Sequence, residues 1–274
     1  MSTNYMIGTV RTDTFTMDYL RFGNGDSAFV ILPGLSIQSV MGAAEAVVAE
    51  YASLADHFTI YLFDRRKNLP ASYSVKEMAE DTAIAMSALG LRDVYLFGAS
   101  QGGMMAMVIA IEHPELVKKL VLGSTSSHVW DHQYEVLDRW VDMAHSGDRK
   151  ALYLEFGEKI YPSAVFEQFR DVLAAAAESV TDEDLERFVI LAEGTRGFNI
   201  TDDLIKIKCP VLAIGVFEDA VLDSDATMEI AEKLDERKDF RLYMYIGFGH
   251  AAFDTAPDYR ERIMHFLIEE KNTV

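Results

Sequence analysis

The sequence predicts an α/β fold: a mostly parallel sheet with helices on both faces and an inserted all-helical cap. Short, continuous apolar runs such as 28–32 and 94–97 alternate with segments of helical periodicity. Strands that alternate with helices at this spacing form parallel sheets buried on both faces. From about residue 127 onward only helical periodicity remains, until the alternation resumes near residue 206. We therefore expect a core of residues 1–126 and 206–274 and a cap of residues 127–205.

The first part of the core contains the clearest signals for individual elements. We expect strands over 28–32, 58–63, 94–97 and 120–122, and helices over 43–54, 75–89 and 101–112. Ser74 precedes the second helix as a cap, and Gly90 follows it as a stop signal. The Asn24-Gly25 pair lies between apolar runs and is typical of a hairpin turn. We therefore expect the segment before this turn to pair with the strand after it.

The cap and the second part of the core follow the same reasoning. We expect cap helices over 134–144, 150–160, 164–176 and 185–192, and later a strand over 210–214, a helix over 226–234, a strand over 240–245 and a helix over 259–269. Thr181 and Asp184 form the looser version of a capping box at the last cap helix. A helical block inserted between strands of one sheet predicts a lid over their carboxyl ends, where ligands bind.

Composition excludes several classes of protein. The 25 basic and 44 acidic residues give a net charge of −19, which opposes binding to nucleic acid or anionic membranes. The first five residues lack a secretory pattern, and no apolar run reaches the length of a membrane span. Because Cys209 is the single cysteine, we expect a cytoplasmic protein. The scattered histidines predict no metal and no cofactor, and the sequence does not indicate the oligomeric state.

The pentapeptide Gly98-Ala99-Ser100-Gln101-Gly102 carries the strongest functional signal. It follows the apolar run 94–97 and opens the expected helix over 101–112. A serine on a sharp turn from strand to helix holds its hydroxyl above the sheet, and glycines on both sides prevent backbone collisions. Ser100 is therefore the candidate nucleophile.

Two partners for this hydroxyl are expected after later strands. His250 follows the expected strand over 240–245 in a glycine-containing loop, and the other histidines lack this placement. The loop after 210–214 offers three carboxylates, of which Asp219 is the leading candidate, with Glu218 and then Asp223 as substitutes. A carboxylate behind the imidazole fixes its tautomer and stabilises the imidazolium. The chain order Ser100, Asp219, His250 is the one expected for this architecture.

An oxyanion hole requires two backbone N–H groups near the serine. Gln101, the residue after Ser100, is expected to supply one of them. The loop 33–36 follows an expected strand and should supply the other; since Pro33 has no N–H, Leu35 is the best candidate, and Ser36 could contribute its hydroxyl.

These segments together give the chain a resemblance to the α/β-hydrolase superfamily, in its cap-bearing, single-domain form, over nearly the whole length. The matching segments are Pro33-Gly34-Leu35, Asp64-Arg65, Gly98 to Gly103, His113 to Val117, Cys209 to Leu212 with the loop to Asp219, and Gly249-His250. Two positions differ from what relatives often carry. Pro33 replaces a histidine before the glycine of the oxyanion loop. Glu218 occupies the usual position of the acid, and Asp219 follows it.

The resemblance implies a serine hydrolase that works through an acyl-enzyme intermediate. Aromatic and methionine residues in the cap favour a small apolar or amphipathic ester as substrate. Carbon–carbon bond hydrolases, thioesterases and lactonases in the superfamily use the same triad and stay open as alternatives. A non-catalytic ligand-binding protein on the same scaffold is a further alternative.

Overall fold

The computed structural model describes residues 4–269. Residues 1–3, part of the segment expected to lack a secretory signal, and residues 270–274 lie outside the described residues. The strands are β1 (Tyr5–Arg11), β2 (Thr16–Phe22), β3 (Ser27–Leu32), β4 (Phe58–Arg66), β5 (Val94–Ala99), β6 (Val117–Gly123), β7 (Val211–Val216) and β8 (Phe240–Tyr245). They form one sheet in the order β1-β2-β4-β3-β5-β6-β7-β8. β1 and β2 run antiparallel to their neighbours and all other pairs are parallel, which confirms the predicted sheet.

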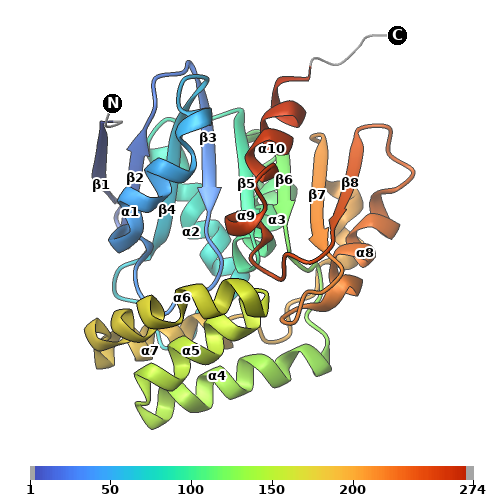
Figure 1. Cartoon of the computed structure of the whole chain (residues 1–274). Coiled ribbons are helices and arrows are strands. Elements are labelled where there is room, and N and C mark those ends of the chain that lie inside the picture. The colour runs from blue at the N-terminus through green and yellow to red at the C-terminus, as the bar shows by residue number, and fades with distance from the viewer. Residues whose placement is uncertain (1–3, 270–274) are drawn as a thin grey trace.

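Helices cover both faces of the sheet (Figure 1). One face carries α1 (Ala44–Glu50), α9 (Ala252–Thr255) and α10 (Tyr259–Ile268), and the other carries α2 (Val75–Ala88), α3 (Gln101–Glu112) and α8 (Asp223–Leu234). Successive side chains of a strand point to opposite faces. In β3, Phe29 and Ile31 therefore belong to the core under α1 and α10, whereas Val30 and Leu32 belong to the core under α2 and α3. No helix among residues 4–269 is long and apolar enough to cross a bilayer.

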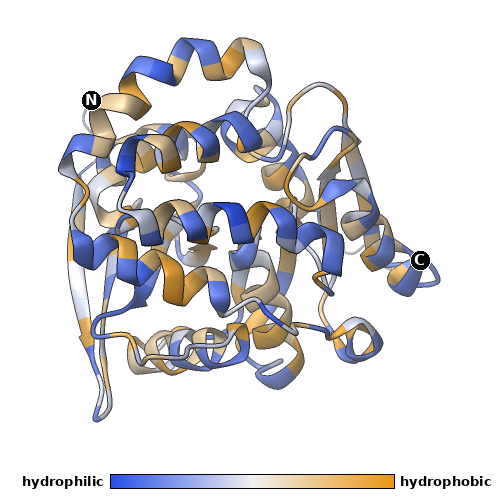
Figure 2. Cartoon of the chain, turned by 90° about the horizontal axis from the view of Figure 1, so that it is seen from below, coloured by the Kyte–Doolittle hydropathy of each residue, from blue (hydrophilic) through white to orange (hydrophobic). Residues whose placement is uncertain are grey.

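The inserted block consists of four helices between β6 and β7, as the sequence predicts. They are α4 (Tyr134–Ser146), α5 (Arg149–Ile160), α6 (Ser163–Ala176) and α7 (Asp182–Glu193). Figure 1 shows them stacked beneath the carboxyl ends of the strands. Seen from that side in Figure 2, hydrophilic and hydrophobic segments alternate along the helices, as in amphipathic helices packed on a core. The capping box of Thr181 and Asp184 is present at the start of α7.

The expected hairpin around Asn24-Gly25 is wrong. β2 pairs with β1 and β4, and β3 pairs with β4 and β5, so β4 lies between the two strands that the turn connects. Gly23 and Gly25 instead allow the backbone of this turn to pass close to the residues that lead into β4. A Cβ on Gly25 would lie 2.0 Å from the His57 carbonyl oxygen, and one on Gly23 2.3 Å from that of Phe58. The Asn24 N–H donates to the Ala55 carbonyl, which fixes this crossing.

Candidate active site

Ser100 lies on the sharp turn between β5 and α3. Its backbone has φ 52° and ψ −124°, a conformation that costs a non-glycine residue free energy and persists only where its surroundings enforce it. A Cβ on Gly98 would lie 2.3 Å from the Gly102 carbonyl oxygen, and a Cβ on Gly102 would lie 2.1 Å from that of Leu32. Both glycines are therefore required sterically. The Ser100 N–H donates to the carbonyl of Gly123 at 2.8 Å, which fixes the turn to the end of β6.

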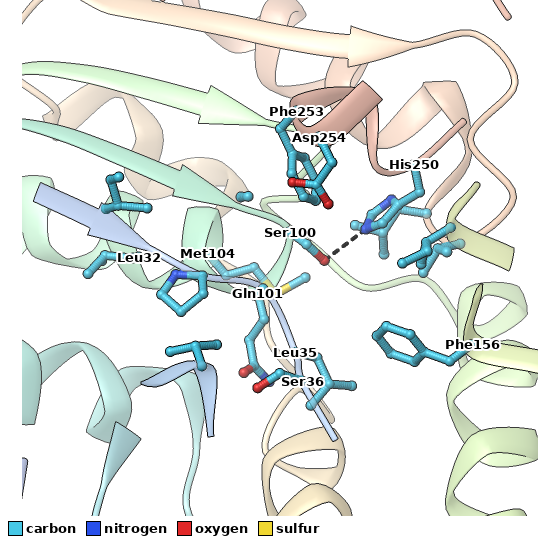
Figure 3. Close-up of a pocket in the computed structure, with 18 of the residues that line it drawn as sticks. Leu32, Leu35, Ser36, Ser100, Gln101, Met104, Phe156, His250, Phe253 and Asp254 are labelled. Carbon is cyan, nitrogen blue, oxygen red and sulfur yellow. Dashed lines mark hydrogen bonds between the residues drawn. The ribbon is translucent and has the colours of Figure 1, made fainter. Parts of the chain in front are cut away.

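The Ser100 hydroxyl is the first member of a chain of hydrogen bonds. Its Oγ lies 2.9 Å from His250 Nε2, and His250 Nδ1 lies 2.8 Å from Asp219 Oδ2. Figure 3 shows this hydrogen bond as a dashed line between the imidazole and Ser100. His250 and Asp219 are 3% and 8% exposed, so water is largely excluded from both contacts. The structure thus brings together the three side chains that the sequence singles out.

The other two acidic candidates have different partners. Glu218 accepts a hydrogen bond from the Gly247 N–H at 2.7 Å, in the loop that leads to His250. Asp223 contacts His132 at 2.7 Å, and its other oxygen accepts from the N–H of Asp225 at the start of α8. Neither carboxylate contacts His250. In contrast, Asp219 Oδ1 accepts from the N–H groups of Val221 and Leu222, which fixes the orientation of the carboxylate.

The loop after β3 approaches the serine closely. A Cβ on Gly34 would lie 3.1 Å from the Ser100 Cβ, so the absence of a side chain allows this approach. In the part of the chain that the structure describes, the Leu35 N–H donates to no backbone oxygen. Gln101 is the first residue of α3, where a backbone N–H has no acceptor within the helix. Both expected oxyanion donors therefore remain available to a ligand.

A buried guanidinium that the sequence did not suggest supports both of these segments. Arg65, at the end of β4, is 4% exposed, and its Nη2 donates to the Pro33 carbonyl at 2.9 Å and to Gln101 Oε1 at 3.0 Å. Burial lowers the pKa of Arg65 to about 10, which still leaves it charged at neutral pH. No carboxylate in residues 4–269 lies within ion-pair distance of this guanidinium. Its positive charge is therefore held close to both expected oxyanion donors without a direct counterion.

We expect Arg65→Met to lower kcat by about 10- to 100-fold with little change in KM, less than the loss of a direct oxyanion donor. The substitution leaves the Pro33 carbonyl and the Gln101 side chain without their donor and removes the nearby charge. Affinity for a trifluoromethyl ketone that forms a tetrahedral adduct should fall in parallel. Arg66→Met, which breaks a contact with Asp81, is the matched control and should leave kcat near that of the wild type. Equal losses in both variants would indicate general destabilisation instead.

Polar contacts connect the cap to this same region. Gln101 Nε2 donates to the carbonyl of Leu191 in α7 at 2.7 Å. Arg187, also in α7, forms an ion pair of 2.6 Å with Asp64, and both side chains are largely buried. Tyr153 of α5 donates to Gln38 Oε1 at 2.8 Å. The cap is therefore attached to the segments that flank Ser100.

A cavity of about 310 Å³ lies between core and cap and opens onto the Ser100 hydroxyl. Apolar side chains from both parts form most of its wall, among them Val47, Leu62, Phe97, Met104, Leu137, Trp140, Phe156 and Leu222. Figure 3 shows Leu35 and Phe156 near the serine. Such a cavity suits a small, largely apolar molecule.

Comparison with known proteins agrees with this architecture. The family model described as the alpha/beta hydrolase fold matches residues 28–257. A putative carbamate hydrolase, RutD, of Agrobacterium fabrum is 26% identical over 257 residues, 88% of this chain and 95% of its own. The crystal structure of MGS-M2, an alpha/beta hydrolase enzyme from a Medee basin deep-sea metagenome library, superposes with a TM-score of 0.86 at 20% identity, covering 97% of this chain and 99% of that one. The crystal structure of the enol-lactonase from Burkholderia xenovorans superposes with a TM-score of 0.81 at 18% identity, covering 96% of this chain and 100% of that one. The chain belongs to the α/β-hydrolase fold family.

Proposed function

We propose that this protein is a serine hydrolase that cleaves a small apolar or amphipathic carboxylic ester through an acyl-enzyme intermediate. The observation that supports this most is the continuous hydrogen-bonded series from Ser100 through His250 to Asp219, at 2.9 Å and 2.8 Å. Such a series lets an imidazole accept the serine proton while the carboxylate stabilises the resulting imidazolium.

The proposed reaction has two halves. The Ser100 oxygen attacks the ester carbonyl carbon as its proton passes to His250 Nε2, and the N–H groups of Leu35 and Gln101 hold the oxyanion. Collapse of the tetrahedral intermediate expels the alcohol, which takes the proton from His250. Water then attacks the acyl-serine with His250 as base, and the carboxylic acid leaves. The single cysteine supports our placing the enzyme in the reducing cytoplasm.

Carbamate hydrolysis is the second candidate, because the Agrobacterium relative is named a putative carbamate hydrolase and matches most of the chain. A carbamate presents the same type of carbonyl to Ser100. Lactone, thioester and carbon–carbon bond cleavage remain alternatives that the same three side chains could serve.

Covalent labelling with a fluorophosphonate tests the proposal directly. The wild type should be labelled stoichiometrically at Ser100, as located by peptide mass spectrometry, and Ser100→Ala should not be labelled. A panel of p-nitrophenyl esters of increasing chain length, with a lactone, a thioester, a carbamate and a vinylogous diketone beside it, then identifies the bond cleaved. Absence of labelling would contradict the hydrolase proposal and favour a ligand-binding protein.

A further inference from the structure

A single carboxylate lines the otherwise largely apolar cavity beside Ser100. It belongs to Asp254 in α9, four residues after His250, and no other acidic or basic side chain, apart from His250, contributes to the cavity wall in residues 4–269. Figure 3 shows the Asp254 carboxylate directed into the cavity on the side of Ser100, with Phe253 next to it. No motif in the sequence marks this residue.

Asp254 is an exposed residue that borders two hollows. It lines the cavity beside Ser100 and also a second, polar hollow that Glu50 and Arg260 line. A molecule in the cavity can therefore touch the carboxylate.

The charged and titratable groups around Asp254 leave it without a close cation. Arg260 of α10 forms its ion pair with Glu50 of α1, and no basic group of the described chain lies within ion-pair distance of Asp254. Tyr161, after α5, donates one long hydrogen bond of 3.5 Å to its Oδ2. His250, Tyr51 and Tyr259 are the remaining titratable groups nearby.

The ionised form of Asp254 is consequently disfavoured. Burial raises the pKa of this carboxyl from 3.8 to about 6, with Glu50 adding to the increase and Arg260 opposing it. A carboxylate without a close cation at the edge of a largely apolar cavity is stabilised by a partner that compensates its charge. A ligand that supplies a positive charge or a strong donor would provide that compensation.

We propose that Asp254 determines substrate specificity: its carboxylate binds an ammonium group of the substrate, and it repels substrates that carry a carboxylate in that place. This inference rests on the proposed hydrolase function and names its substrate class, a small ester with a basic amine near the scissile carbonyl. Phe253 supports the assignment, since an aromatic ring beside the carboxylate can contact an ammonium group through its face.

Pairs of esters of equal size, one with an ammonium group and one neutral, separate the effect of charge from that of size. With the amine in the alcohol part, 2-(dimethylamino)ethyl butyrate is compared with the neutral 3-methylbutyl butyrate. With the amine in the acyl part, ethyl 3-(dimethylamino)propanoate is compared with the neutral ethyl 4-methylpentanoate and with the anionic ethyl hydrogen succinate. In at least one of the two parts, the wild type should prefer the ammonium ester by about 10- to 100-fold in kcat/KM, the range of a charge-assisted hydrogen bond. Asp254→Asn should bring this ratio close to one and improve hydrolysis of the succinate ester.

Acidification provides a second measure of the same preference. As the pH falls below about 6, Asp254 takes up a proton and the ammonium preference should decrease. Because both esters of a pair undergo the same bond cleavage at Ser100, the ratio of their kcat/KM values reports Asp254. Glu261→Gln is the matched control, since it removes a carboxylate that lines the polar hollow but not the cavity and that forms no ion pair among residues 4–269, and the preference should persist.

Stability should respond to the same carboxylate. Because the folded-state pKa is raised, the folded protein retains a proton that the unfolded chain has already released between about pH 4 and 6. Stability therefore decreases as the pH rises through this window. Asp254→Asn should raise Tm relative to the wild type at pH 7.5, and the gain should shrink at pH 4.5. A gain that is equal at both pH values would contradict an unpaired carboxylate at this position.

Binding distinguishes failure of this inference from failure of the proposed function. If Ser100 is not labelled by the fluorophosphonate and none of the esters is hydrolysed, the hydrolase proposal fails, and calorimetric titration with 2-(dimethylamino)ethanol and 3-methylbutan-1-ol still tests Asp254. The amino alcohol should bind more tightly to the wild type, and Asp254→Asn should lose that difference. If the wild type shows no preference in hydrolysis or binding, or if Asp254→Asn retains it, the specificity proposal is overturned.

Discussion

Replacing Ser100 with alanine is expected to reduce kcat by about 10⁴- to 10⁶-fold while KM changes little. The hydroxyl is the atom that forms the acyl bond in the proposed reaction, and no other hydroxyl in the described chain lies within hydrogen-bonding distance of His250. The residual rate then comes from the oxyanion donors and from substrate binding alone. Steady-state kinetics on a p-nitrophenyl ester, with the protein pure enough to exclude traces of wild type, measure the loss.

Ser124→Ala is a suitable control for this experiment. Ser124 follows β6, next to the Ser100 turn, and its buried hydroxyl has no hydrogen-bond partner among residues 4–269. Its replacement should leave kcat near the wild-type value, with comparable thermal unfolding for both variants. If Ser100→Ala retained more than about one hundredth of the turnover, another group would have to be the nucleophile.

Replacing Asp219 with asparagine should lower kcat by about 10³- to 10⁴-fold without disturbing the fold. The asparagine amide can fill the same space, but it can present an N–H to His250 Nδ1 and thereby favour the wrong tautomer. It also cannot stabilise the imidazolium that forms when Ser100 loses its proton. The measurement is kcat on the same p-nitrophenyl ester as for Ser100→Ala.

Glu218→Gln and Asp223→Asn are the informative comparisons, because the sequence left these acids open. Their carboxylates contact the Gly247 N–H and His132 rather than His250. Each substitution should therefore cost less than about tenfold in kcat, as expected for a loop contact. A loss for Glu218→Gln as large as that for Asp219→Asn would move the role of the acid to Glu218.

The sequence predicted the parallel core and the four-helix insertion well. Buried strands appear in it as short continuous apolar runs, and amphipathic helices appear as apolar residues at helical spacing. It did not predict β1, whose side chains are mostly exposed at the edge of the sheet, so that no apolar alternation marks it. The hairpin was wrong for a different reason. The local Asn24-Gly25 signal is genuine, but the insertion of β4 between β2 and β3 is a long-range choice that no turn residue records.

The residues of the candidate site also fall into those that the sequence singled out and those that it did not. Ser100 and His250 stand beside glycines in recognisable loops, and the structure brings them into contact; their catalytic roles stay predictions. Arg65 and Asp254 gave no such signal, since their significance depends on which atoms surround them in the fold. The preference for Asp219 over Glu218 likewise depends on loop geometry, which spacing alone leaves open.

The bond between Gln101 and the Leu191 carbonyl has a consequence for protein engineering. The same glutamine side chain accepts from Arg65, which donates to the Pro33 carbonyl, so a backbone atom of the cap is three hydrogen bonds away from the loop that contains Leu35. A cap transplanted from another hydrolase would have to reproduce that carbonyl, or the recipient would lose turnover even on substrates that fit. Cap and core of this enzyme are therefore poor candidates for exchange as independent modules.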